Sequence, residues 1–248
     1  MRSRKSPRRS LPAEDRLRAS ALRWVRGAAA VLGLALSIPA WAQFGASATV
    51  ESDYRYRGVS LSDGKPSARL TLNYDGDERW YAGASATRAT LIANESYPQL
   101  VGYAGWLAPP TDGRSVEIGV DAAHFSGISG YDFAEAYVGL LADRWSARLY
   151  LSPDYYGRSV PVAYAELDAH VPLHEHARLL AHFGTLVPLR DEPGIAGKAR
   201  VDVSLGAGFV WAPVELRVLW VAATEGGPYP AVRNGRHSTI VVGASISF

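Results

Sequence analysis

Charged side chains occupy alternate positions around residue 50. Glu51, Asp53, Arg55 and Arg57 are each two residues apart, and apolar or aromatic residues fill most of the positions between them. A helix would scatter these charges around its axis, whereas a β-strand places residues of one parity on the same side. Carboxylates and guanidinium groups on one side of a strand can pair with one another or contact water. The spacing therefore predicts a strand with one charged face and one apolar face.

The same alternation recurs along the rest of the chain. In residues 116–122, for example, Val, Ile, Val and Ala alternate with Glu, Gly and Asp. We interpret the charged positions as one polar face, shared by all the strands, that would line a water-filled pore. The predicted pore-lining residues are Glu51, Asp53, Arg55, Arg57, Arg69, Asp121, Glu135, Arg148, Glu166, Asp168, Arg178, Asp202, Glu215 and Arg217.

Few residues suggest catalysis. The chain has no Cys, so disulfides and thiolate metal sites are excluded. His124 and Ser126 share a face, as a base and a nucleophile could, but the sequence offers no evident acid or amide to orient His124. His174 and His176 flank Glu175 in a short predicted turn, where solvated histidines are more common than metal ligands. We therefore predict no catalytic residues, no metal and no cofactor.

The first 42 residues form a predicted leader. An Arg-rich stretch precedes an apolar run at residues 27–38, and Ala40 and Ala42 then give the small-x-small pattern of a signal-peptide cleavage site. A membrane anchor is the alternative interpretation, but the run is shorter than the roughly 20 residues that a spanning helix needs. We expect residues 1–42 to be a signal peptide cleaved after Ala42, and residues 43–248 to form the mature protein.

Removal of the leader changes the charge balance. The whole chain has 26 basic and 24 acidic residues, of which nine and two lie in the leader, so the mature part has a formal net charge of −5. A negative net charge gives no support to nucleic-acid binding. We expect no nucleic-acid partner.

The strand pattern indicates a membrane barrel. Twelve alternating segments are expected after residue 43, and no apolar run there is long enough for a membrane helix. Connections alternate between short ones, such as 142–144, and longer ones, such as 91–98, 155–161 and 224–237. This asymmetry is typical of outer-membrane barrels, which have short periplasmic turns and longer outside loops. We predict an all-β fold, a closed antiparallel transmembrane β-barrel of about 12 strands in a bacterial outer membrane.

Parity also predicts the register of the first hairpin. A loop at residues 63–65 would pair Arg57 with Thr71 and Tyr54 with Tyr74, so that the arginines share the inner face. The outward aromatic residues would form girdles at the two membrane interfaces. These girdle residues are expected to be Trp80, Trp106, Trp145, Trp211, Tyr54, Tyr56 and Tyr74.

The last predicted strand ends on an aromatic residue. Ile240, Val242, Ala244 and Ile246 share one face with Phe248, the final residue. A terminal aromatic that follows alternating apolar residues resembles the signal read by the barrel-assembly machinery. We therefore expect Ile246 and Phe248 to act in assembly, with that machinery and outer-membrane lipid as partners.

A family resemblance supports this fold. The segment Ser52-Asp53-Tyr54-Arg55-Tyr56-Arg57-Gly58-Val59-Ser60-Leu61-Ser62, followed by Pro66, resembles the opening motif of the TorF-type porins, the Gcw_chp family of proteobacterial outer-membrane proteins. This chain departs from the pattern after the proline, where it has Arg69 and Leu70 and the family often has small residues. The resemblance implies a porin without indicating its solute.

Three functional classes are consistent with the sequence. The leading hypothesis is a passive channel for small polar solutes, in which Arg57 faces the lumen near its outer end and helps to set ion preference. The alternatives are a non-conducting structural barrel, in which a carboxylate such as Asp53 holds Arg57, and a lipase-like or protease-like outer-membrane enzyme. A surface adhesin would need larger loops than those at residues 224–237.

Overall fold

The structure is a computed structural model that describes residues 43–92, 94–190, 199–229 and 237–248. The predicted leader and its cleavage residues, Ala40 and Ala42, lie outside these ranges. Among the described residues, no helix is long and apolar enough to cross a membrane.

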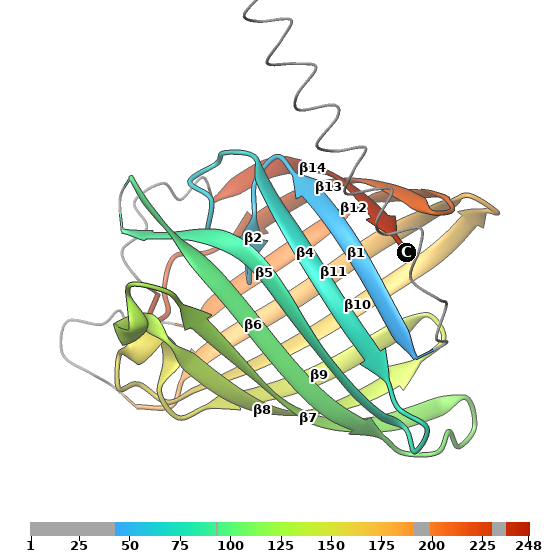
Figure 1. The fold of residues 1–248 in the computed structure, drawn as a ribbon, viewed down its shortest axis with the longest axis horizontal. Helices are drawn as coiled ribbons and strands as arrows, with labels where there is room; N and C mark the ends of the chain where they lie inside the picture. Colours follow the sequence, from blue (N-terminus) through green and yellow to red (C-terminus); the bar gives the residue numbers. More distant parts are fainter. Residues whose placement is uncertain (1–42, 93, 191–198, 230–236) are drawn as a thin grey trace, which may run out of the picture. The chain divides into compact units, whose positions relative to one another are not determined.

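Twelve antiparallel strands close into a barrel (Figure 1). Each wall strand pairs with the wall strands next to it in the chain, and the first wall strand pairs with the last, so the ring is closed. Closure satisfies the backbone N–H and C=O groups that lipid cannot. The predicted barrel is therefore confirmed. The wall strands are β1 (Phe44–Glu51), β4 (Ser67–Asp75), β5 (Trp80–Ile92), β6 (Glu95–Leu107), β7 (Arg114–Phe125), β8 (Phe133–Ala142), β9 (Trp145–Ser152), β10 (Val162–His174), β11 (Ala177–Pro188), β12 (Arg200–Trp211), β13 (Val214–Ala223) and β14 (Ser238–Ser247).

The outer face of the wall is apolar. On β4, Leu70 and Leu72 are each 64% exposed, whereas the alternate residues Arg69 and Thr71 face the interior and are less exposed. A row of exposed leucines is unfavourable in water but suits contact with lipid tails. The alternation that predicted strands therefore also assigns the outer and inner faces.

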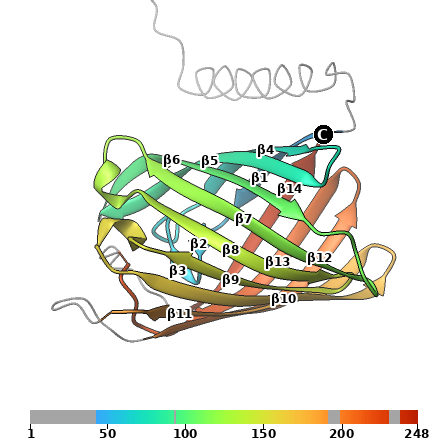
Figure 2. The same ribbon diagram turned by 90° about the horizontal axis from the view of Figure 1, so that it is seen from below.

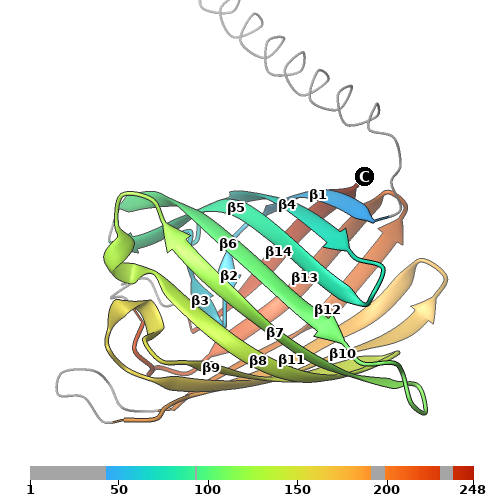
Figure 3. The same cartoon turned by 60° about the horizontal axis from the view of Figure 1, so that its bottom comes forward.

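The two ends of the barrel differ (Figures 2 and 3). The end that carries the connections 76–79, 108–113, 143–144, 175–176 and 212–213 is called the turn end, and β1 begins and β14 ends there. The opposite end, called the loop end, carries two short 3-10 helices, Ser129–Tyr131 and Tyr155–Gly157.

The prediction of a long loop at residues 91–98 is wrong. Most of these residues belong to β5 and β6, which are separated only by residues 93 and 94. The polar residues Glu95 and Ser96 suggested a loop, but Ser96 lies opposite Thr90, and the two hydroxyl oxygens are 2.9 Å apart. Polar side chains can therefore extend this hairpin beyond the membrane-facing part of its strands.

The first hairpin also differs from the prediction. β1 ends at Glu51, opposite Ser67, and the register places Ser47 opposite Thr71 and Phe44 opposite Tyr74. The predicted partners of Thr71 and Tyr74, which were Arg57 and Tyr54, are therefore wrong. Residues 52–66 leave the wall and enter the lumen, and we call this segment the inward fold.

The inward fold forms its own small sheet inside the barrel (Figure 2). β2 (Arg55–Tyr56) pairs with β3 (Val59–Ser60) across a turn in which Arg57 and Gly58 have φ of 49° and 74°. Glycine suits this left-handed turn. Alternation did not reveal the change of direction, because residues 52–56 continue the alternating pattern of β1.

Tryptophans mark the outer face of the turn end. Trp80 lies opposite Trp106 in the register, and Trp80 and Trp211 are 57% and 51% exposed. Trp145 begins β9 at the same end. Tyr54 and Tyr56 do not join an interfacial girdle as predicted, because they lie in the inward fold, with Tyr54 only 5% exposed.

Tyrosine rings lie along the inner wall over glycines of neighbouring strands. A Cβ added at Gly119 would be 2.4 Å from the Tyr137 ring, and one at Gly83 would be 2.4 Å from the Tyr103 ring. The glycines leave room for the rings to lie against the wall. The rings therefore line the lumen rather than fill it. The four such pairs are Tyr103–Gly83, Tyr81–Gly105, Tyr137–Gly119 and Tyr164–Gly184.

Candidate functional site

The inward fold crosses the lumen and ends against the far wall. Arg57 donates hydrogen bonds to both carboxylate oxygens of Glu135 on β8, at 2.9 and 2.6 Å, and one to the Tyr155 hydroxyl at 3.1 Å. The side chains of Arg57 and Glu135 are 5% and 0% exposed. A bidentate pair fixes orientation as well as distance. The turn of the inward fold is thus held to β8.

Aromatic rings surround the Arg57 guanidinium. Its central carbon lies 4.0 Å from the ring centroid of Tyr164, 4.8 Å from that of Tyr56 and 5.0 Å from that of Tyr150. Cation–π contacts of this kind strengthen when water is excluded. Arg57 therefore lies in the lumen, with its charge neutralised by Glu135. Asp53, the partner considered from sequence, is instead 2.7 Å from Arg55.

A second contact fixes the turn laterally. A Cβ added at Gly58 would lie 2.6 Å from the Ala223 Cβ and 2.7 Å from the Asp202 Cβ, so the backbone packs directly on β12 and β13. Within the fold, the Asp53 carboxylate accepts hydrogen bonds from the Ser60 and Ser62 hydroxyls, at 2.5 and 3.1 Å. The inward fold is therefore braced both internally and against the wall.

An apolar cluster fills the loop end of the lumen around the inward fold. Leu61 is fully buried, and its backbone carbonyl accepts a hydrogen bond from the backbone N–H of Thr90 at 2.7 Å. Tyr155 and Tyr156 pack against Tyr229 with ring centroids 5.5 and 5.9 Å apart. The buried cluster consists of Tyr54, Val59, Leu61, Ala89, Leu91, Ala123, Phe125, Phe133, Tyr155, Tyr156, Val160, Val162, Tyr164 and Leu186.

Burial also changes the acidity of the loop tyrosines. Loss of solvation raises the pKa of Tyr229 to about 12 and raises the pKa of Tyr155 as well, although the nearby Arg57 opposes both shifts. These hydroxyls therefore stay protonated at neutral pH, and the cluster remains uncharged. The loop end of the lumen is constricted in this structure.

Two cavities between described residues lie in the lumen below the apolar cluster. The first, called the central chamber, has a volume of about 390 Å³ and lies against Arg55, Tyr56 and Arg57 of the inward fold. The second, called the turn-end cavity, has a volume of about 400 Å³. Arg148 and His182 line both cavities. The cavities thus meet, and together they extend from the inward fold toward the turn end.

Ion pairs span the walls of these cavities. The Arg148 Nε donates to Glu117 at 2.6 Å, and Arg148 also lies 3.7 Å from Glu166. Arg178 and Arg217 both donate to Glu215, at 2.6 and 2.8 Å. Charges of both signs therefore remain in the lumen and offset one another.

The structure places the fourteen predicted residues in two groups. Asp53, Arg55 and Arg57 lie in the inward fold rather than on a wall strand. The other eleven lie on wall strands with lumen-facing parity, and most are paired; Glu51, for example, accepts from Arg69 at 2.7 Å. Their role in conduction stays a prediction.

The tyrosines of the chamber were not among the predicted site residues. Tyr150 shares a face with Arg148, and Tyr164 shares a face with Glu166, so parity already placed both opposite the apolar side. The predicted pore-lining residues were all charged, so these two uncharged side chains were left out although their parity predicts the inner face.

A histidine bridges two carboxylates in the lumen. His182 Nδ1 lies 2.7 Å from Asp168, and its Nε2 lies 3.0 Å from Asp202. Ligand-type atoms of Glu166, Asp168 and His182 lie within 4.8 Å of one another. Both ring nitrogens of His182 already contact carboxylates, so the geometry describes an ion-pair network rather than an assembled metal site.

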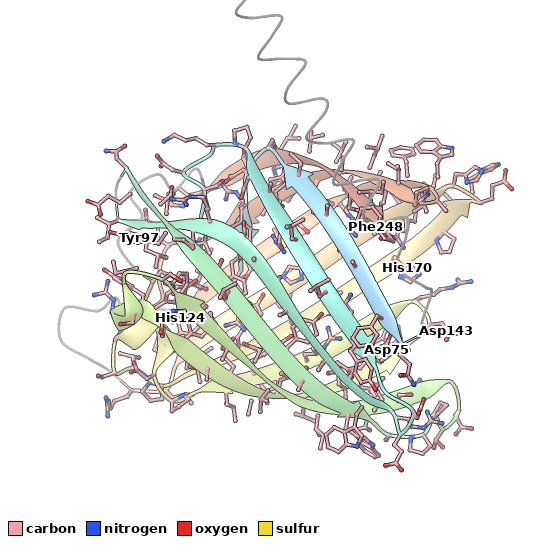
Figure 4. All side chains as sticks on the ribbon, viewed as in Figure 1. Asp75, Tyr97, His124, Asp143, His170 and Phe248 are labelled. Atoms are coloured by element: carbon pink, nitrogen blue, oxygen red, sulfur yellow. The ribbon has the colours of Figure 1, made fainter. Side chains whose placement is uncertain are left out.

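His124 has an acidic partner that the sequence did not reveal. Its Nδ1 lies 2.6 Å from Asp132, which also accepts a hydrogen bond from the Phe125 backbone at 2.8 Å. The prediction that no acid orients His124 is therefore wrong, because the loop that contains Asp132 folds back on β7. Figure 4 shows His124 at the loop end, far from Asp75 and Asp143 at the turn end.

A closed wall, an apolar outer face and a charged lumen define a bacterial outer-membrane β-barrel. The chain belongs to the family described as bacterial protein of unknown function (Gcw_chp), whose match covers residues 40–241. No curated protein matches the sequence.

Solved structures share the fold. A KdgM porin aligns with a TM-score of 0.53 and 12% identity, over 82% of this chain and 99% of that one. A KdgM porin in complex with disordered oligogalacturonate aligns with a TM-score of 0.51 and 10% identity, over 83% and 99% of the two chains. At this identity the likeness establishes the barrel fold and leaves function to the residues.

Proposed function

We propose that this protein is an outer-membrane channel for small polar solutes, in which the inward fold forms the constriction. The observation that carries the proposal is the pair of cavities with charged side chains in their lining, which meet at Arg148 and His182 and end at Arg57. A barrel that served only as a scaffold would have no need for open space lined by charged groups inside its wall. Charged groups of both signs solvate polar solutes and ions.

In the proposed channel, the inward fold narrows or closes the lumen. Its turn is held by the Arg57–Glu135 ion pair, and the apolar cluster surrounds it at the loop end. Conduction requires either a narrow path beside this segment or its displacement. The same cluster is the observation that favours the second candidate, a non-conducting structural barrel.

An enzyme is the weaker alternative. His124 and Asp132 form a base and an orienting acid, but the His124 and Asp132 side chains are 53% and 34% exposed. Among the described residues Ser126 forms no hydrogen bond with His124, and its backbone N–H donates to the backbone carbonyl of Pro98. A triad also needs a nucleophile within hydrogen-bond distance of the base.

Three further assignments belong to this proposal. The family resemblance supports the TorF-type porin class. The alternating residues before Phe248 support delivery by the barrel-assembly machinery, with Ile246 and Phe248 as the recognised residues. The small residues Ala40 and Ala42 support export by a cleaved signal peptide, residues 1–42, which leaves residues 43–248 as the barrel.

Planar-bilayer recording of the refolded mature protein tests the channel. The wild type is compared with a variant in which residues 54–64 are replaced by a short Gly/Ser linker. The linker can be short because Glu51 and Ser67 face each other across the hairpin. We expect a measurable conductance in the wild type and a severalfold larger one in the variant. Silence of both proteins, when both show the heat-modifiable mobility of a folded barrel, would refute the channel and establish the structural barrel.

A further inference from the structure

The central chamber has the surface composition of a carbohydrate site. Six tyrosines line it, from five wall strands and from the inward fold. Aromatic faces bind the C–H faces of sugar rings, while neighbouring polar groups bind the hydroxyls. The six tyrosines are Tyr56, Tyr81, Tyr103, Tyr137, Tyr150 and Tyr164.

These tyrosines form a continuous curved surface. The ring centroids of Tyr137 and Tyr150 are 5.1 Å apart, those of Tyr150 and Tyr164 are 6.1 Å apart, and those of Tyr81 and Tyr103 are 6.4 Å apart. The Tyr81 and Tyr137 hydroxyl oxygens, 2.6 Å apart, join the two groups of rings. Because glycines let several rings lie along the wall, ring surface faces the chamber without filling it.

Most charged groups of the chamber are held in ion pairs. Arg57 pairs with Glu135, Arg148 pairs with Glu117, and His182 lies between Asp168 and Asp202. A site for a free anion or cation would instead offer unpaired charges of the opposite sign. Paired charges on fixed side chains present hydrogen-bond donors and acceptors to a neutral, hydroxyl-rich solute.

One acceptor in the chamber is available to a solute. The Asp121 carboxylate lines the chamber but forms no hydrogen bond with another residue that the structure describes. Its neighbours Glu117 and Glu166 accept from Arg148 or from tyrosine hydroxyls, such as that of Tyr150 at 3.0 Å. Hydroxyl groups of a ligand would give Asp121 the partners that the protein does not provide.

We propose that the central chamber binds a neutral sugar of one or two rings as it passes through the channel. The inference rests on the proposed channel function, because the chamber can be reached from both sides of the membrane only through an open lumen. A volume of about 390 Å³ lies in the range of small-molecule sites. The tyrosine surface supplies stacking, and Asp121 and the arginines orient the hydroxyl groups.

Calorimetric titration of the folded mature barrel with maltose tests this site without requiring conduction. The charged probe is maltobionate, and its matched control is maltitol, which has the same open-chain second unit without the carboxylate. We expect maltose to bind with a millimolar or lower Kd and maltobionate to bind at least several times more weakly than maltitol. Equal affinity of maltobionate and maltitol would overturn the neutral class, and no binding of maltose would overturn the site.

Three variants locate the binding. Tyr150→Ala should raise the Kd for maltose about tenfold by removing the ring between Tyr137 and Tyr164. Asp121→Ala should raise it about fivefold, the usual net effect of one hydrogen bond. The fold should stay intact, because the Asp121 side chain forms no hydrogen bond or ion pair with a described residue. Leu149→Ala, on the lipid-facing side of the same strand and 42% exposed, is the control and should leave the Kd unchanged. Unchanged binding in both chamber variants would place the sugar elsewhere.

The two proposals fail separately. In the bilayer, maltose added at millimolar concentration should reduce the wild-type current and should not reduce that of the Tyr150→Ala variant. A conducting barrel that binds no maltose keeps the channel and loses the sugar site. A silent barrel that binds maltose with the predicted variant effects keeps the site and loses the channel.

Discussion

Arg57 and Glu135 lie 78 residues apart in the sequence and form a buried bidentate ion pair across the lumen. The arginine is at the turn of the inward fold, and the carboxylate is on β8 of the far wall. Each charge has lost its water, and each depends on the other for compensation. The consequences of breaking this pair can be measured.

Arg57→Ala and Glu135→Gln should each lower the free energy of unfolding by about 3 to 5 kcal/mol, because each leaves a buried charge without its partner. The double variant should lose less than the sum of the two. Urea titration of the barrel in lipid vesicles measures these values. Arg217→Ala is the control, since the Arg217 side chain is 50% exposed and a change of about 1 kcal/mol or less is expected. Additive losses would show that the pair is not coupled.

The double variant Arg57→Ala/Glu135→Gln should leave the ion preference of the channel nearly unchanged. It removes one charge of each sign, and the intact pair already offsets both charges, so little of their field reaches the aqueous cavities. Reversal potentials under a salt gradient test this expectation for the wild type and the variant. A clear shift toward cations in the variant would instead restore the role as a selectivity charge that the sequence suggested.

Gly119→Val should destabilise the barrel by about 1 to 3 kcal/mol, the usual effect of overpacking. The new side chain would meet the Tyr137 ring and the backbone carbonyl of Ala104, at 2.4 and 2.7 Å from its Cβ. Gly102→Val is the matched control, because a Cβ there meets nothing within 4 Å. Unfolding in urea compares the two variants. Equal stability would show that the Tyr137 ring can leave its position over Gly119 at no cost.

Mass spectrometry of the protein purified from outer membranes should give a mature chain that begins at Gln43. The expected reason is cleavage after Ala42 by the enzyme that reads small residues at Ala40 and Ala42. Ala42→Tyr should block processing. Retention of Arg26 in the purified protein would contradict the leader assignment.

Deletion of Phe248 should reduce the amount of heat-modifiable barrel in the membrane and leave the conductance of each folded molecule unchanged. Phe248 follows β14 and is 46% exposed, and it is not one of the residues that line the chamber. Semi-quantitative gel analysis of membranes measures the first effect, and bilayer recording measures the second. Phe248→Tyr keeps a terminal aromatic ring and should assemble normally.

The alternation of apolar and polar residues predicted the wall strands, because outward side chains contact lipid and inward side chains contact the polar lumen. Leu70 and Leu72 face outward and Arg69 inward, and this arrangement depends only on parity. The inward fold could not be predicted in the same way. Its path depends on Glu135, Ala223 and Asp202, which are distant in the sequence and meet Arg57 and Gly58 only after the barrel has formed.

For the candidate site, too, the sequence predicted which residues face the lumen and did not predict their partners. The charged residues of the lumen follow from parity, but their pairing does not, because the partners lie on different strands; Arg178 and Glu215, for example, are separated by β12. The tyrosine surface required knowledge of which strands are neighbours. The acid beside His124 required the path of a loop.

The contact of the inward fold with β8 also divides the wall into halves. β1 and β4 to β8 precede the contact in the ring, and β9 to β14 complete it. Bringing Arg57 to Glu135 closes a loop of 78 residues, which costs less conformational entropy than the closure of nearly the whole chain between β1 and β14. The Arg57–Glu135 pair therefore keeps the first six wall strands together. It reduces the loss of conformational entropy that accompanies the pairing of β1 with β14.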